Sequence, residues 1–299
     1  MTTLEQILDL GPDIAVAFEN LTFSEYLDID AVNSSCLKHG RDRTPSHISE
    51  CMIRSRFDTS SNSPSLRIGA LVHSMCLEPE TVDELYVVKP GNIDRRTREG
   101  KAQYEQWSEK AGDRQVILGS EWNLATSMAE SFRNSFAAPY IEKESVPASQ
   151  QYESWFHGRE MTIVWVDPEG TVCKARLDAC AWNDVEFRIF DIKTTDNASP
   201  DSFKQTASRY GYDMQAAFYS WAAHEFSGVE PENITVQFIV IEKQSPHNVA
   251  CYTLAKEDIE TAGVEIQKML KEFSEDPMRG YPEHAVELSR LTNPSERFG

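Results

Sequence analysis

The stretch at residues 172–195, VCKARLDACAWNDVEFRIFDIKTT, decides the fold. It contains two runs rich in Val, Ile, Phe and Trp, at 171–182 and 185–194. Between them stands Asn183-Asp184, a dipeptide typical of tight turns. The stretch therefore predicts two antiparallel strands joined as a β-hairpin.

This hairpin carries charged residues that suit hydrolytic chemistry. Asp191 and Lys193 project together from the end of an otherwise apolar face, because side chains alternate along a strand. A carboxylate can hold Mg²⁺, and a lysine can orient or deprotonate a neighbouring water. Asp178, on the partner strand, can supply a second metal ligand. The residues are equally compatible with strand-end carboxylates paired with Lys193, since a D-x-K tripeptide is common by chance.

Three motifs follow one another in the chain: RLD at 176–178, DIKTT at 191–195 and YGYDMQAAFY at 210–219. In this order they resemble the PD-(D/E)XK nuclease superfamily, and most closely its exodeoxyribonuclease VIII type from phages and prophages. The similarity extends over about 26–282, although Leu177 stands where many members carry proline. The resemblance implies an α/β (α+β) fold like that of restriction endonucleases, with a mixed central β-sheet flanked by helices and an N-terminal helical region.

The resemblance also assigns roles to residues. A helix at 66–80 carries a G-x-x-x-H pattern from Gly69 to His73, which in the family places the histidine at the metal site. By composition alone His73 is a packed core histidine, and Gln215 and Tyr219 are a polar and an aromatic residue on one helical face. The implied catalytic set is Lys193, Asp191, Asp178, Gln215, Glu160 and Tyr219, and the implied metal ligands are His73, Asp178 and Asp191.

The first core strand offers the further acidic residue that the family carries there. The segment at 159–178 predicts a hairpin closed by Asp167-Pro168-Glu169-Gly170. Symmetric pairing about that turn places Glu160 opposite Leu177 and beside Asp178. Glu153, in the strand-like YESWF, is the competing candidate.

Charge argues against simple DNA binding. The chain has 299 residues, 40% of them hydrophobic, enough for one large domain or two small ones, and a net charge of −19. Phosphates repel such a protein at long range, although a local basic channel remains compatible with it. Basic residues gather at Arg41, Arg43, Arg54, Arg56 and Arg67, and again at Arg95, Arg96, Arg98 and Lys101. Either group is typical of a solvated loop. On the nuclease interpretation the second group contacts the DNA backbone.

The six cysteines are scattered without a C-x-x-C motif, which predicts reduced thiols and argues against the iron–sulfur branch of the superfamily. No apolar run is long enough to span a bilayer, and the N-terminus lacks a basic region followed by an apolar stretch. A cytoplasmic protein without a membrane partner is expected.

The remaining pattern predicts the domain organisation. Ser34 or Ser35 caps a short helix, Pro45 opens the next, and a single helix covers 201–226. A buried strand at 234–244, a neighbouring strand at CYTL and a helix at 256–275 follow. The predicted division is an arm at 1–25 and a single exonuclease domain at 26–299. That domain comprises a mainly helical part at 26–148, the catalytic sheet with its Gln/Tyr helix at 149–255, and a closing helix and tail at 256–299.

The resemblance implies a Mg²⁺-dependent exodeoxyribonuclease, with Mn²⁺ as a substitute, that digests double-stranded DNA ends from 5′ to 3′. It further implies a ring-like homo-oligomer, a phage single-strand annealing protein as partner, and a phage or prophage gene expressed in a bacterial host. Two alternatives stay open. One is a nuclease of the same fold acting on single strands or flaps, and the other is a catalytically silent, acidic interaction protein. The intact set of Asp178, Asp191, Lys193 and Gln215 favours catalysis.

Overall fold

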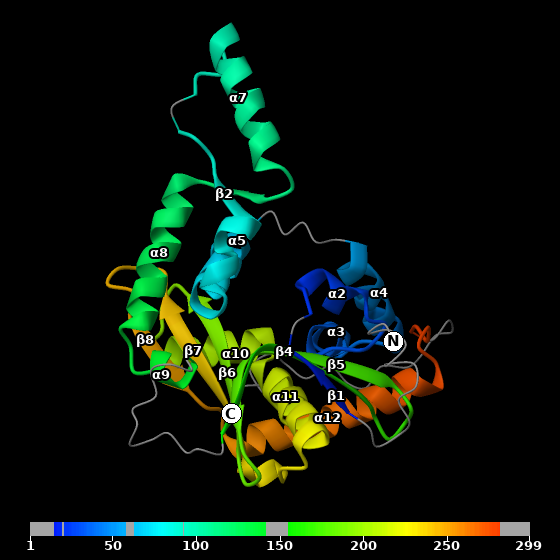
Figure 1. Ribbon diagram of the computed structural model, residues 1–299. Helices are drawn as coiled ribbons and strands as arrows, with labels where there is room; N and C mark the ends of the chain where they lie inside the picture. Colours follow the sequence, from blue (N-terminus) through cyan, green and yellow to red (C-terminus); the bar gives the residue numbers. More distant parts are fainter. Residues whose placement is uncertain (1–14, 20, 58–62, 92, 142–154, 282–299) are drawn as a thin grey trace, which may run out of the picture.

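A computed structural model describes residues 15–19, 21–57, 63–91, 93–141 and 155–281. Its centre is a six-stranded mixed sheet in the order β1-β4-β5-β6-β7-β8, with helices on both faces (Figure 1). The strands are β1 (Val16–Phe18), β4 (Phe156–Val166), β5 (Val172–Trp182), β6 (Phe187–Thr195), β7 (Ile234–Glu242) and β8 (Val249–Tyr252). This architecture confirms the predicted fold class.

Only β6 and β7 run parallel, whereas the other neighbours in the sheet pair antiparallel. A parallel pair requires a crossover connection, which here consists of α10 (Pro200–Tyr210), α11 (Tyr212–Ser227) and the short η2 (Pro231–Asn233). The crossover places α11 directly against the sheet. It thereby places α11, the helix of the YGYDMQAAFY motif, over β6, the strand that carries the DIKTT motif.

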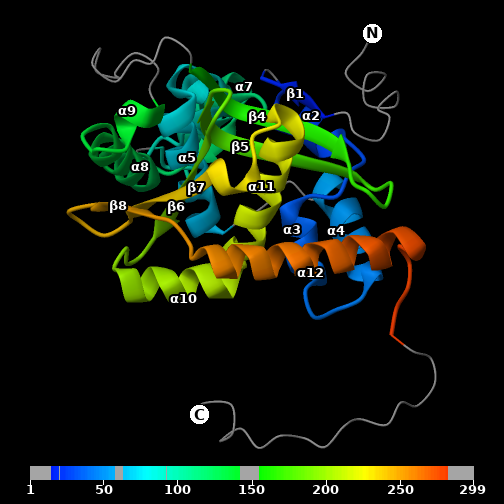
Figure 2. The same ribbon diagram turned by 90° about the horizontal axis from the view of Figure 1, so that it is seen from below.

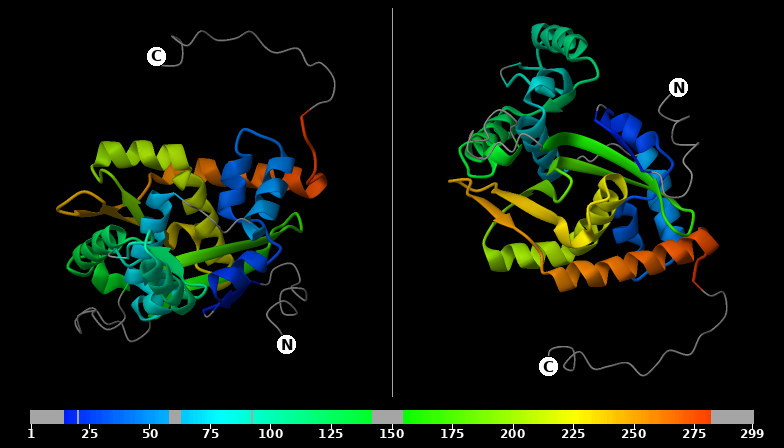
Figure 3. Two further views of the ribbon diagram at one scale, coloured as in Figure 1. Left: turned by 90° about the horizontal axis from the view of Figure 1, so that it is seen from above. Right: turned by 60° about the horizontal axis from the view of Figure 1, so that its bottom comes forward.

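The larger core lies between the sheet and a layer that contains α10, α11, α3 (Ser34–Gly40), α4 (Pro45–Phe57) and α12 (Lys256–Glu275). Trp165 of β4 and Phe218 of α11 are almost fully buried there, with ring centroids 4.9 Å apart. Helix α12 crosses this layer and packs against α3, α4 and α11 (Figures 2 and 3). Buried aromatic and aliphatic side chains thus hold α3 and α11 close together beside the sheet.

A second core covers the opposite face. It is formed by α5 (Pro64–Leu77), α8 (Gly119–Arg133) and α9 (Ala138–Ile141), with Leu71, Met128 and Phe132 fully buried. The short η1 (Pro79–Thr81) and α6 (Val82–Leu85) follow α5, whereas α2 (Phe23–Asp28) stands between β1 and α3 in the chain and packs against α4. Helix α5 therefore reaches the sheet from the face opposite α11.

An extension stands out from the body above α5 and α8 (Figure 1). It consists of the parallel strands β2 (Tyr86–Val88) and β3 (Gln115–Ile117) with α7 (Arg98–Ala111) between them. The second basic group lies in the turn before α7 and in the first turn of this helix, where the Arg95 guanidinium covers the Tyr104 ring at 4.1 Å. The structure thus keeps these arginines on the extension rather than at the sheet.

Three local predictions need correction. Strand β6 begins at Phe187 rather than 185, because the Oδ1 of Asn183 accepts hydrogen bonds from two backbone N–H groups and lengthens the turn. Helix α3 is capped by Asn33, whose side chain accepts from the Cys36 N–H, so neither predicted serine is the cap. The predicted helix at 201–226 is divided at Gly211, where a φ of +63° ends α10.

Several other predictions hold. Pro45 opens α4, and α12 covers the predicted 256–275. All six cysteines are free. By contrast, residues 16–18 of the predicted arm form β1, which pairs with β4 at the edge of the sheet. Across the part of the chain that the structure describes, no helix combines the length and the apolar character needed to cross a membrane.

Candidate active site

The pairing of β4 with β5 is interrupted at one level. Met161 pairs with Leu177 and Arg159 with Ala179, while Glu160 and Asp178 between them make no ladder pair. Glu160 has a φ of +48°, a conformation that residues other than glycine seldom adopt. The backbone at this level therefore leaves the regular ladder, and the two carboxylate side chains point towards one position.

The predicted symmetric register was therefore wrong by one residue. Val166 pairs with Val172, so the connecting loop extends to Thr171 and is longer than the predicted four-residue turn. The Asp167 side chain accepts hydrogen bonds from the N–H groups of Glu169 and Thr171, which stabilises the longer loop. The shift moves Glu160 from the level of Leu177 to that of Asp178.

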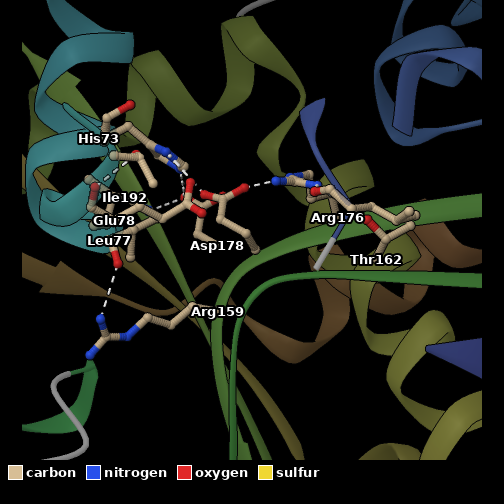
Figure 4. A network of polar contacts seen from close by, with 12 residues as sticks. His73, Leu77, Glu78, Arg159, Thr162, Arg176, Asp178 and Ile192 are labelled. Atoms are coloured by element: carbon tan, nitrogen blue, oxygen red, sulfur yellow. Dashed lines mark hydrogen bonds and ion pairs between the residues drawn. The ribbon is translucent and has the colours of Figure 1, made fainter. Parts of the chain in front are cut away.

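Helix α5 brings His73 to these two carboxylates, and Figure 4 shows the imidazole pointing towards Asp178. Its Nε2 lies 2.9 Å from Asp178 Oδ2, and its Nδ1 lies 3.3 Å from Glu160 Oε1. One donor atom from each of the three residues lies within 4.8 Å of the others. Arg176 holds the far oxygen of Glu160 through its Nε. The three side chains therefore form a compact cluster of one imidazole and two carboxylates.

A second group lies on β6 and α11. Asp191 is almost fully buried, and its Oδ2 lies 2.5 Å from the Nζ of Lys193. Its Oδ1 accepts a 2.7 Å hydrogen bond from the Nε2 of Gln215. The predicted relation between the second and third motifs is thus a direct contact between their side chains.

The backbone of β6 joins the two groups. The N–H of Ile192, between Asp191 and Lys193, donates a 2.8 Å hydrogen bond to Asp178 Oδ2. Pairing between β5 and β6 ends at Ala179 and Phe190, so the strands separate at this level and leave room for side chains between them. Side chains carried by α5 and α11, on opposite faces of the sheet, consequently meet at one opening.

A family model for the "PDDEXK-like domain of unknown function (DUF3799)" matches residues 35–277. The chain belongs to this family. The match includes His73, Glu160, Asp178, Asp191, Lys193 and Gln215. It bears out the resemblance to the PD-(D/E)XK superfamily.

One solved structure shares the fold of this PDDEXK-like domain. A protein from Eubacterium rectale described as a "Putative exonuclease" is similar with a TM-score of 0.50 and 13% identity, over 93% of this chain and 98% of the other. Protein VC1899 from Vibrio cholerae matches with a TM-score of 0.27 and 9% identity, over 88% of this chain and 57% of the other. Among curated proteins, none matches the chain in sequence. The family supports a nuclease, and the first of these structures supports the fold.

The electrostatics of the site of the PDDEXK-like domain reflect crowded carboxylates. Burial raises the pKa of Glu160 and of Asp191, and the charge of Asp178 adds to both shifts. Burial also opposes ionisation of Asp178, but His73 and Lys193 hold its pKa below the usual value. Burial would lower the pKa of His73, yet the neighbouring carboxylates raise it to about 9. Without a metal, protons and cationic side chains offset the negative charge.

These residues fit a divalent cation. Glu160 Oε1 and Asp191 Oδ2 are buried oxygens without a well-aligned hydrogen bond within the described structure. Carboxylate oxygens are the ligands that Mg²⁺ prefers, and an imidazole suits Mn²⁺ as a softer neighbour. A cation would satisfy these oxygens and relieve the repulsion that raises their pKa values. His73, Glu160 and Asp178 are the donors already assembled, with Asp191 beside them.

Lys38, like Arg176, is a residue of the site to which the sequence analysis assigned no role. Lys38 lies in the last turn of α3, and its Nζ donates a 2.9 Å hydrogen bond to the Oε1 of Gln215. Lys38 and Lys193 also lie over the same ring, that of Tyr212, at 5.5 and 5.0 Å from its centroid. Burial and the charge of Lys193 lower the pKa of Lys38 to about 7. No local signal distinguishes it, because a lysine in the last turn of a helix is common on electrostatic grounds alone.

Other predicted residues lie further away. Tyr219 is buried in α11 one turn after Gln215, and burial raises its pKa, with the charges of Asp191 and Asp178 adding to the shift. Arg95, Arg96 and Arg98 lie on the extension that carries α7. Glu153 lies outside the described residues. The structure thus groups His73, Glu160, Asp178, Asp191, Lys193 and Gln215 and leaves the three arginines apart from them.

Proposed function

We propose that this protein is a Mg²⁺-dependent exodeoxyribonuclease that hydrolyses phosphodiester bonds of linear double-stranded DNA. The single observation that carries this proposal is the meeting of the His73–Glu160–Asp178 cluster with the Asp191–Lys193 pair at one opening of the sheet. A buried core has no need of so many charged groups in one place, since each costs free energy to desolvate. Metal-assisted hydrolysis of a phosphodiester does use such groups, to hold the cation and to neutralise developing charge.

The residues of the site have different roles in the proposed reaction. His73, Glu160, Asp178 and Asp191 would hold Mg²⁺, which, when bound, supplies Lewis-acid stabilisation of charge on a phosphate oxygen. Burial opposes the charged form of Lys193, but Asp191 and Asp178 raise its pKa, so it stays protonated at neutral pH. Lys193 is therefore suited to orient the attacking water and to neutralise developing negative charge, rather than to remove a proton.

Gln215 and Arg176 orient the carboxylates. Gln215 restrains Asp191 from α11, and Arg176 restrains Glu160 from the neighbouring strand. Charged oxygens held in this way need little rearrangement during the reaction, which lowers the barrier. Since Gln215 is buried and bonded at both ends of its amide, its orientation is set before substrate binds.

The finer features of the proposal rest on the resemblance to exodeoxyribonuclease VIII. It supports 5′-to-3′ digestion, a ring-like oligomer, recombination with a phage single-strand annealing protein, and a place in the cytoplasm of a bacterial host. The net charge of −19 requires that DNA approach through a local patch of positive potential.

The decisive experiment compares wild type with Asp191→Asn on three DNA substrates: linear duplex, covalently closed circular duplex and single strands. Mg²⁺-dependent release of nucleotides from linear duplex alone, lost in Asp191→Asn, is expected. Asp184→Asn is the matched control, because this exposed carboxylate lies in the turn of the same hairpin. A preference for single strands would favour the flap-type alternative. If wild type, Asp191→Asn and Asp184→Asn all release no nucleotides with Mg²⁺ or Mn²⁺, the catalytically silent interaction protein would be favoured.

A further inference from the structure

A cavity opens beside the candidate active site. It has a volume of about 350 Å³ and lies between the end of α3 and the junction of α10 with α11. Lys38, Arg41 and Arg209 contribute cationic groups to its lining, and Ser208, Tyr210 and Gly211 complete the side formed by the helix junction. In a chain with 29 basic and 48 acidic residues, this concentration of positive charge sets the cavity apart.

The cavity communicates with the active site through Lys38. This residue lines the cavity and at the same time donates a hydrogen bond to Gln215, which holds Asp191. A group bound in the cavity therefore lies one side chain away from the site where the phosphodiester would be cut. Neighbouring phosphates of a nucleic-acid strand are the groups that naturally occupy two adjacent positions of this kind.

The two arginines differ in what they offer. Arg41 is held by bidentate contacts with Asp213 and with Glu265, so its charge is offset and its main effect is to fix α3 against α11 and α12. Arg209 is exposed, its guanidinium lies over the Tyr210 ring at 5.6 Å, and none of the described carboxylates forms an ion pair with it. Arg209 is thus the cation available to a ligand at the rim, as Lys38 is at the inner wall.

The junction itself suits a nucleotide better than a free anion. Tyr210 is about 55% exposed, and its ring stacks on Tyr212 with centroids 6.2 Å apart. An exposed ring next to cationic groups is what single strands use, since bases stack on the ring while phosphates meet the charges. Gly211 allows this geometry, because an added Cβ would lie 3.2 Å from Lys38 Cγ.

We infer that this cavity binds a phosphate of the DNA strand adjacent to the scissile one, with Arg209 and Lys38 as its cationic partners. The inference rests on the proposed function, which it deepens by assigning a second phosphate position. The phosphate has two sources: the terminal monoester of a strand end, or an internal diester. Both present the same anionic oxygens to the cavity.

The test measures binding without cleavage. Fluorescence anisotropy with a short labelled duplex in EDTA compares wild type, Arg209→Ala and Arg209→Lys, with Lys204→Ala as the matched control. Lys204 is exposed on the same helix and does not line the cavity. We expect about a tenfold loss of affinity in Arg209→Ala and a salt-dependence slope lower by about one. Arg209→Lys should recover most of the affinity, and Lys204→Ala should bind as wild type.

Duplexes with a 5′-phosphate and with a 5′-hydroxyl distinguish the two sources of the phosphate. If the Arg209→Ala loss appears with a 5′-phosphate and vanishes with a 5′-hydroxyl, the cavity takes the terminal monoester. A loss on both duplexes indicates an internal diester. Equal binding by wild type, Arg209→Ala and Lys204→Ala, or no binding by wild type, would overturn the inference. Because no cleavage is involved, this result is independent of whether the protein hydrolyses DNA with Mg²⁺, which the Asp191→Asn comparison decides.

Discussion

His73 Nε2 lies 2.9 Å from Asp178 Oδ2, which joins helix α5 to strand β5 across the opening of the sheet. The imidazole is the only member of the assembled His73–Glu160–Asp178 cluster that can carry positive charge. Its protonation state therefore links the stability of the metal-free protein to its ability to accept a cation.

Stability without metal should fall as the pH rises. The folded protein holds the pKa of His73 at about 9, whereas an unfolded histidine has a value of about 6.5. The stabilisation is complete below about pH 6.5 and is lost as the pH rises through about 9, with a loss on the order of 2 kcal/mol after allowance for solvent screening. Urea denaturation in EDTA should show this decline in wild type and a flatter profile in His73→Gln. Parallel profiles would contradict the assignment.

Divalent cations should stabilise the folded protein. A cation that binds only the folded state stabilises it by RT ln(1 + [L]/Kd), so the melting temperature rises with the logarithm of the cation concentration once this exceeds the dissociation constant. A thermal melt in Mg²⁺ or Mn²⁺ should therefore show a rise of a few degrees in wild type and in Asp184→Asn. Asp178→Asn, which removes one assembled donor, should show little or none. The effect should increase with pH, because His73 must lose its proton to bind metal. An equal rise in all three proteins would place the cation elsewhere.

Gln215→Ala should destabilise the protein by about 2 kcal/mol. Gln215 is only 6% exposed, and its removal takes away the hydrogen-bond acceptor of Lys38 Nζ and the donor to Asp191 Oδ1, while Asp191 Oδ2 keeps its contact with Lys193. Gln205→Ala, on the exposed side of α10, is the matched control and should change stability by less than about 0.5 kcal/mol. Urea midpoints with unchanged slopes measure both. A cost for Gln215→Ala no larger than that of the control would show that these contacts contribute nothing to folding.

Two glycine-to-alanine changes should have opposite signs. Gly211→Ala places a Cβ on a residue with φ of +63° and at 3.2 Å from Lys38 Cγ, so it should cost roughly 1–2 kcal/mol. Gly263→Ala lies within α12 with nothing inside 4 Å of the added Cβ, and should stabilise by roughly 0.5–1 kcal/mol. Thermal denaturation of both variants checks this. A gain from Gly211→Ala would mean that the junction tolerates an ordinary residue.

Local patterns predicted much of the fold. The β5–β6 hairpin, α4 and α12 follow from alternation, turn residues and helical spacing, which act over a few neighbouring residues. The errors occur where two local signals compete. Asn33 precedes two serines that also cap helices well, and Gly211 interrupts a segment whose residues otherwise favour helix on both sides.

The site was predicted in part. Asp191 and Lys193 share a face by strand periodicity alone, so their proximity needed no tertiary information. The placement of His73 and Gln215 rested on the resemblance, because residues of different helices have no spacing rule that relates them. Glu160 was the preferred acidic residue, but its register was wrong by one residue, since the length of a loop depends on hydrogen bonds such as those of Asp167.

The sequence by itself determined the mixed α/β class, the DIKTT strand and its resemblance to PD-(D/E)XK nucleases, because these depend on residue type and short spacing. Only the tertiary structure decided which donors assemble and that Lys38 belongs to the site. Lys38 reaches Gln215 because α12 and the Arg41 ion pairs hold α3 against α11. Contacts between segments so far apart in the chain arise from packing of whole layers, and no local pattern encodes them.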